Sequence, residues 1–377
     1  MELVRGEWRT YNYALNLKGD APAQGKMDIS VVNIEENAGQ VPVNYVLPPG
    51  VTRIIDPGQS QITQLNEQAM SLKVTDLQSG DARAVYKNSG MDMRTYKRLQ
   101  MFVHAEKLID DKTNLRDGDV SVFLRLGSDS KSNYYEYEVP LSLTEPGNYS
   151  TYNAQDQEAV WPQSNMFDFP LSLFTDLKLE RNAKKRMDNS TVTFQTRYSS
   201  YDPDKNQNKV TIVGNPSLSD VRTMMIGVRN NSNAAKDIVV WVNEMRLTDF
   251  DQSGGWAAKA NVNLGLSDIA TLNIAGHVET VGFGGIDQSL TERRLDDYYQ
   301  YNIATMVELG RFLPEKVKLK APLFYSIPEQ RTSPKYNPLD QDILLKDALD
   351  NAGSKAERDS ICLLYTSDAA DDRISVD

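Results

Sequence analysis

Hydrophobic and polar residues alternate along most of the first 250 positions, which is the pattern of half-buried β-strands. Turn-forming runs such as "RDGD", "EPGN" and "YDPDKNQN" separate these stretches. The alternation is clearest over 99–108, 119–128, 132–143, 190–198, 221–230 and 238–250. Because no long helices intervene, the pattern predicts an all-β fold whose main part is an antiparallel, jelly-roll-like β-sandwich over residues 26–252.

Helix is a minor component of the predicted fold. The Pro- and Gln-rich stretch 44–77 is interpreted as a connection that wraps the sandwich, with a short helix near 64–70. Two longer helices are expected over 171–186 and 339–360. In the second, Asp340 stands at the N-cap position. Its apolar stripe consists of Ile343, Leu344, Ala348 and Leu349.

The pattern changes over residues 253–326, where four stretches of about 9–11 residues alternate almost strictly and predict four strands in two hairpins. The last of these strands is expected to begin near Lys316. One face of the predicted strands is apolar and includes Ala260, Val262, Leu264, Leu272, Ile274, Val278, Ile303, Val307 and Leu319. The opposite face is polar and includes Lys259, Asn261, Asn263, Asn273, His277, Lys318 and Lys320.

Two structures fit this alternation. Tilted strands of this length can cross a bilayer. Tight turns at one end, with the long link 280–297 at the other, are typical of outer-membrane barrels. A soluble antiparallel sheet with one solvated face has the same alternation. The pattern alone therefore leaves a membrane barrel and a soluble sheet both open.

Composition narrows the class of protein. The chain has 377 residues, of which 40% are hydrophobic and 25% charged, as is typical of folded domains. It has no run of 18 apolar residues, which excludes a transmembrane helix, and no apolar signal segment at its start. The net charge is −11, and the short basic run 182–186 is too small to predict nucleic-acid binding.

The last residues are not expected to belong to the fold. Residues 362–377 begin with "CLLYTSDAADD", which matches a transposase-based sequencing adapter translated in frame. We interpret them as an artefact and expect the natural chain to continue past Ile361. They also contain the only cysteine, Cys362, so the remaining residues can form no disulfide, thiol nucleophile or cysteine-ligated metal site.

One loop is a weak candidate for metal binding. Four potential ligands of a calcium ion stand at alternate positions, namely Asp202, Asp204, Asn206 and Asn208. The loop lacks the central Gly of such a site and has Val213 in place of the bidentate Glu. A polar hairpin turn is therefore the favoured interpretation.

The other titratable groups are expected to be solvated. His104 and Glu106 share a strand face, and with two histidines in the chain neither a zinc site nor a His-dependent nucleophile is expected. A glycosidase needs two carboxyl groups at a defined distance from each other. The segments 34–37 and 136–138 contain carboxylates, but the sequence does not show the distance between them. "GFGG" at 282–285 lacks the helix that a dinucleotide loop opens. We therefore predict a protein that is not an enzyme and has no cofactor.

Several unusual segments occur together in the order seen in one known family. They include "RGEWRTYNY", "VNIEENAGQVPVNYVLPPGVTRIIDPGQ", "VWPQSNMFDFPLSLF", "GGWAAKANVNLGLSD" and "SPKYNPLDQDILLKDALD". From about residue 4 to 361 the chain resembles the SprA/Sov family, the translocons of the type 9 secretion system of Bacteroidota. The resemblance implies a giant outer-membrane β-barrel that passes folded cargo to the cell surface and supports gliding motility, with this chain as an internal segment.

The resemblance also implies roles for the predicted parts. The apolar face of 253–326 would contact outer-membrane lipid, and the polar face would line the lumen. The leading segment 1–25 could itself be a barrel strand, the sandwich would be an insertion, and 327–361 would be a loop with a short helix. Implied partners are secreted cargo proteins with C-terminal secretion signals and accessory outer-membrane and plug proteins, but not nucleic acid. If the tight turns are periplasmic, the sandwich lies on the extracellular side.

Two other functions remain open from the residues alone. A soluble, carbohydrate-binding-like β-sandwich module of a secreted enzyme would use 253–326 to complete a sheet whose apolar face meets a core. A jelly-roll glycosidase would use Glu136 and Glu138 as its acid and base.

Overall fold

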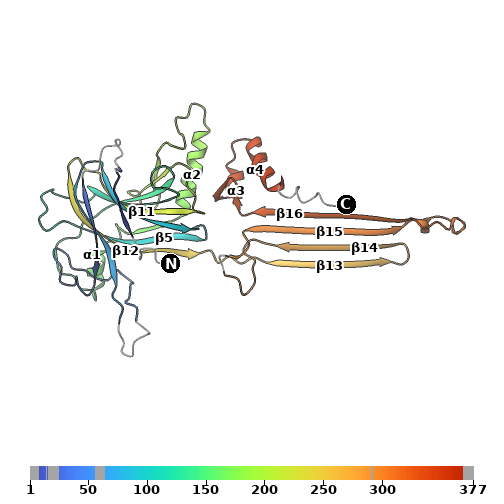
Figure 1. Ribbon diagram of the computed structural model, residues 1–377, viewed down its shortest axis with the longest axis horizontal. Coiled ribbons are helices and arrows are strands. Elements are labelled where there is room, and N and C mark those ends of the chain that lie inside the picture. Colours follow the sequence, from blue (N-terminus) through green and yellow to red (C-terminus); the bar gives the residue numbers. More distant parts are fainter. Residues whose placement is uncertain (1–7, 14, 16–24, 56–63, 290–291, 368–377) are drawn as a thin grey trace. The chain divides into compact units, whose positions relative to one another are not determined.

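The computed structural model describes residues 8–13, 15, 25–55, 64–289 and 292–367 of the chain. It forms two compact units, Met1–Phe250 and Asp251–Asp377 (Figure 1).

The first unit is built from two antiparallel sheets, which confirms the predicted all-β, antiparallel class; the jelly-roll topology stays a prediction. The seven-stranded sheet has the order β1 (Arg9–Tyr11), β4 (Ala82–Met91), β11 (Val221–Asn230), β6 (Val120–Gly127), β7 (Tyr134–Pro140), β10 (Lys209–Val213) and β9 (Tyr198–Tyr201). The five-stranded sheet has the order β2 (Lys26–Asn33), β3 (Gln68–Leu77), β12 (Lys236–Phe250), β5 (Tyr96–Glu106) and β8 (Phe167–Pro170).

The main core of this unit takes alternate side chains from strands of both sheets. In β6, Val122 and Leu124 belong to this core, whereas Phe123 between them packs in a separate cluster on the other face. That other face is covered as well, and every residue of β6 is buried. Polar residues of the central strands are therefore buried too, which a half-solvated sheet would not require.

The described residues of the first unit include two helices. The helix α2 (Ser172–Lys185) confirms the one predicted over 171–186, and it packs Phe174 and Leu177 into the core. The helix α1 (Ala154–Val160) was not predicted, although Asn153 caps it by accepting a hydrogen bond from the backbone N–H of Gln155.

One sequence prediction for this unit is wrong. Residues 68–70 of the helix expected near 64–70 belong to β3, because pairing with β2 and β12 on both sides outweighs local helix propensity. In the leading segment 1–25, the described strand β1 pairs with β4 at the edge of the sandwich, and residues 16–24 lie outside the described part.

The second unit is dominated by a four-stranded antiparallel sheet (Figure 1). Its order is β13 (Ala257–Leu266), β14 (Ala270–Glu279), β15 (Asp296–Glu308) and β16 (Pro322–Pro334). Short 3₁₀ turns at Leu309–Phe312 and Glu315–Val317 follow β15. The chain then forms a small hairpin and two helices, β17 (Tyr336–Asn337), β18 (Asp340–Leu344), α3 (Leu345–Asp350) and α4 (Lys355–Ser367). None of the helices in the described part of the chain is long and apolar enough to span a bilayer.

Three boundaries in this unit differ from the prediction. The helix expected over 339–360 is replaced at its start by β18, because the side chain of Asn337 accepts a hydrogen bond from the backbone N–H of Leu339 and closes a hairpin. Asp340 is therefore a strand residue and not a helix cap. The expected loop from 327 begins late, because β16 continues to Pro334.

The fourth predicted strand begins at Pro322 and not near Lys316. Lys318 has a backbone φ of +45°, which is incompatible with a strand. Leu319 therefore does not lie on the apolar strand face, and Lys318 and Lys320 do not lie on the polar one. All three belong to the connection 309–321.

Candidate functional site

The sheet β13–β16 is open to solvent on both faces in the described structure. Every residue of β13 is exposed, and large apolar side chains such as Val262 (46%), Leu264 (48%) and Ile303 (37%) keep over a third of their surface accessible. Contiguous exposed apolar surface of this kind marks an interaction site in a folded protein. The sheet is therefore the candidate functional site.

The register places the apolar side chains in rows across the sheet. One row consists of Val262, Ile274, Ile303 and Ile327. The next row toward the 267–269 turn consists of Leu264, Leu272, Thr305 and Tyr325. Ala260, Val278 and Val307 lie on the same face. All the residues predicted for the apolar face therefore share it, except Leu319.

The apolar face has aromatic residues toward its two ends. Tyr299 and Tyr301 lie toward the link 280–295, and Tyr325 lies toward the opposite end. The rows of Tyr299 and Tyr325 are six positions apart along β15, which is about 20 Å at about 3.3 Å per residue. Aliphatic side chains such as Val262, Ile274 and Ile303 lie between these rows. An aliphatic band between aromatic residues is typical of the outer surface of membrane barrels.

The other face is mostly polar. It carries Lys259, Asn261, Asn263, Asn273 and His277, together with the amides Gln300, Asn302 and Gln330, and its exposed apolar residues Met306 and Phe324 lie near the connection 309–321. Near the link, Glu279 is 3.1 Å from His277 Nε2 and 2.6 Å from Arg294 Nη1. This face therefore suits contact with water.

The sheet is not closed in the described residues. β13 pairs with β14 alone, and β16 pairs with β15 alone. The sequence predicted tight turns at one end of the sheet and a long link at the other. The turn 267–269 is tight, as predicted. The connection 309–321 at the same end is not, because it is similar in length to the link 280–295. The two outer strands leave backbone donors and acceptors available for further strands.

The calcium-loop candidate is a hairpin turn, as favoured from its sequence. It joins β9 to β10, and Asp202 and Asn208 are buried in it, whereas Asp204 and Asn206 are exposed. Both carboxylate oxygens of Asp202 accept hydrogen bonds, one from Tyr137 Oη at 2.6 Å and one from the backbone N–H of Asp204. In the described part of the chain, no three His, Cys, Asp or Glu side chains are grouped as a metal site would require.

Glu136 and Glu138 were expected on a solvated strand face, and this expectation is wrong. Both are buried on the outer side of β7, where Arg229 Nη1 contacts both carboxylates. Glu136 also pairs with Arg125 at 2.5 Å and with Arg197. Burial disfavours the ionised Glu136, but the charges of these arginines outweigh it and hold its pKa well below the usual range. Carboxylates paired in this way do not form the open acid–base site of a glycosidase.

His104 and Glu106 are also buried, contrary to the prediction of a solvated pair. His104 Nδ1 donates to the backbone carbonyl of Val160 at 2.7 Å, and its ring stacks on Trp241 at 3.9 Å between centroids. Its Nε2 lies 3.7 Å from Glu106 Oε2. The covering helix α1 is more than forty positions away in the chain, so the strand pattern held no signal of this burial.

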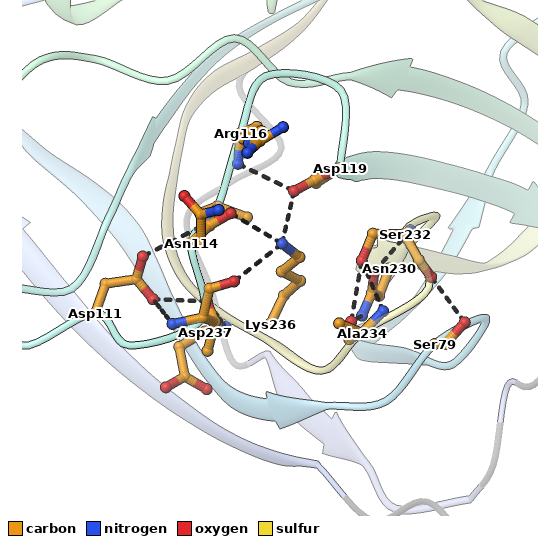
Figure 2. Close-up of polar contacts among 12 residues, drawn as sticks. Ser79, Asp111, Asn114, Arg116, Asp119, Asn230, Ser232, Ala234, Lys236 and Asp237 are labelled. Atoms are coloured by element: carbon orange, nitrogen blue, oxygen red, sulfur yellow. Dashed lines mark hydrogen bonds and ion pairs between the residues drawn. The ribbon is translucent and has the colours of Figure 1, made fainter.

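A buried lysine that sequence reasoning missed, Lys236, joins the 111–119 loop to β12. Figure 2 shows the Lys236 ammonium group among oxygen atoms of the 111–119 loop. It contacts Asp119 Oδ2 at 2.7 Å and donates to the carbonyls of Thr113 and Asn114 at 3.1 Å each. The left-handed backbone of Asn114 (φ +49°) is one that Asn tolerates, and it lets two successive carbonyls reach one ammonium group.

Comparison with known proteins identifies the family. None of the curated proteins matches the chain. A family model, SprA_N, described as "Motility related/secretion protein", matches residues 1–349 and so covers most of both units. The chain therefore belongs to the SprA_N family of motility related/secretion proteins.

Proposed function

We propose that this chain is an internal segment of a giant outer-membrane β-barrel translocon, which passes folded cargo proteins to the cell surface in type 9 secretion and gliding motility. One observation carries the proposal. The sheet β13–β16 has an apolar and a polar face, both exposed, and unpaired outer edges in the described residues. Membership of a motility and secretion family supports it.

Strands of the parent chain, lipid and water would cover the sheet. Within a bilayer every backbone donor and acceptor must be satisfied, so spanning strands occur in closed barrels. Further strands of the parent chain would pair with β13 and β16, lipid would cover the apolar face, and water in the lumen would contact the polar face. If the chain were instead a soluble binding module, the apolar face of the sheet would pack against a core. Leu264 on this face is 48% exposed.

The proposed activity is transport and not catalysis. Selectivity would come from partners, namely cargo with C-terminal secretion signals and accessory outer-membrane and plug proteins. β13 begins at the end of the sheet that carries the link 280–295. If the 267–269 turn is periplasmic, that end is extracellular, and the sandwich that precedes β13 in the chain lies outside the cell.

Substitution of two neighbouring residues on β13 tests the proposal. Leu264→Arg on the apolar face is expected to destabilise the assembled barrel by about 2–4 kcal/mol, because it places a charge in lipid near mid-membrane. Asn263→Arg, one residue away on the polar face, is expected to be tolerated. The measurement is the amount of folded, protease-resistant parent barrel in outer-membrane fractions. Equal loss from both substitutions would contradict the proposed facing.

A further inference from the structure

Side-chain amides dominate the centre of the polar face of the sheet β13–β16. Three successive rows of side chains cross all four strands there, and six of these twelve residues are amides. The six are Asn261, Asn263, Asn273, Gln300, Asn302 and Gln330, all of them exposed. The other six are Lys259, Ala275, His277, Ala304, Ser326 and Pro328. We call these twelve residues the amide patch.

Asparagine is an unfavourable choice for the middle of a strand. It is among the residues that strands disfavour, since its side chain competes for the hydrogen bonds of the nearby backbone. Threonine would give the same contact with water and also favours the strand. Four of the six amides are nevertheless asparagines, on β13, β14 and β15. The stability of the sheet alone therefore does not explain the amide patch.

The chemistry of exposed amides suits a surface that other proteins pass. An amide has both hydrogen-bond donors and an acceptor, but it carries no charge. A hydrogen bond from an amide to a passing protein replaces one to water, so the net gain in free energy is small. A charged side chain instead attracts proteins of opposite charge and repels those of like charge. Because conduction requires contacts weak enough to be released, amides are suited to lining a passage.

We propose that the amide patch is a non-adhesive lining of the lumen, past which folded cargo of either net charge moves equally well. The inference rests on the proposed function, in which the polar face contacts water in the lumen. It adds the substrate class, because the patch does not select cargo by surface charge. The patch spans about 13 Å along the strands and about 14 Å across them. A charge acts over about 8 Å at physiological salt, so a few charged substitutions would change the whole patch.

Secretion by cells that carry the parent barrel tests this inference. Two reporters share one folded domain and one C-terminal secretion signal, but the first has a strongly positive surface and the second a strongly negative one. The measurement is the ratio of their secretion rates, positive to negative, which is expected to be near one for the unaltered barrel. An exposed ion pair strengthens a contact by up to about five-fold. The variant with Asn261→Asp, Asn273→Asp and Asn302→Asp is therefore expected to lower the ratio about five-fold.

The corresponding variant with lysine at the same three positions is expected to raise the ratio by a similar factor. No two of these positions stand directly opposite each other on neighbouring strands, so the added like charges do not face one another across a strand pair. The matched control is Asn261→Ser, Asn273→Ser and Asn302→Ser, which keeps the patch polar without adding charge. It is expected to leave the ratio unchanged.

The outcomes separate this inference from the proposed function. A loss of assembled barrel in a variant lowers the secretion of both reporters alike, so it does not change their ratio. The same ratio in the aspartate, lysine and serine variants would overturn the non-adhesive lining and leave the proposed translocon standing. A ratio far from one in the unaltered barrel would overturn it as well. Secretion of both reporters by cells that lack the parent barrel would contradict the proposed function itself.

Discussion

Replacing Glu136 by Gln is expected to lower the free energy of unfolding of the first unit by about 3–5 kcal/mol. The carboxylate is fully buried and contacts Arg125, Arg197 and Arg229. Glu138 is the second acid of this cluster. Removing the charge of Glu136 leaves three guanidinium groups facing one carboxylate. A buried, uncompensated charge is far more costly than the loss of one surface ion pair.

Denaturant unfolding of the chain measures this effect, with Glu145→Gln as the control. Glu145 is an exposed residue, so its substitution is expected to change the free energy by less than about 0.5 kcal/mol. A similarly small change in Glu136→Gln would show that the arginine cluster does not depend on this carboxylate.

The lowered pKa of Glu136 predicts that the stability of the first unit depends on pH. The pKa of Glu136 is lower in the folded chain than in the unfolded chain, where it is about 4.3. The contribution of the ionised Glu136 to the free energy of unfolding is therefore complete above about pH 4.3. It is lost as the pH falls from there toward the pKa that Glu136 has in the folded chain. We expect the unaltered chain to lose stability steeply below about pH 4, and Glu136→Gln to lose less over that range. Identical acid profiles would contradict this assignment.

Replacing Lys236 by Met is expected to destabilise the first unit by about 3–5 kcal/mol, near the lower limit because Asp119 is partly exposed. Met has a similar length but donates no hydrogen bond. The substitution leaves the Asp119 carboxylate and the carbonyls of Thr113 and Asn114 without their shared donor. Because Lys236 links β12 to the 111–119 loop, that loop is expected to loosen before the core does.

Amide hydrogen exchange across 111–119, together with the unfolding free energy, measures the effect of Lys236→Met. Lys112→Met, an exposed lysine of the same loop, serves as the control. Unchanged exchange in the Lys236 variant would show that the other hydrogen bonds, such as those of Asp111 to Thr113, hold the loop by themselves.

The alternation of residues determined the two faces of the second-unit sheet. In an extended strand, side chains point alternately to opposite sides whatever the neighbouring strand is. Val262 and Leu264 therefore share a face with Ile274, and Lys259 and Asn263 lie opposite, as the pattern predicts. The helix α2 was predictable for the same local reason, because its spacing of apolar residues is set within one segment.

The tertiary structure decided where strands end and what lies above them. The lysine-rich stretch before β16 alternates like a strand, yet it belongs to the connection 309–321, with Lys318 in a left-handed conformation. The burial of Glu136, His104 and Lys236 depends on segments that are distant in the chain, such as α1 over His104. Periodicity reports the direction of a side chain from its own strand. It does not report which distant segment covers that side chain, because that depends on long-range packing and charge pairing.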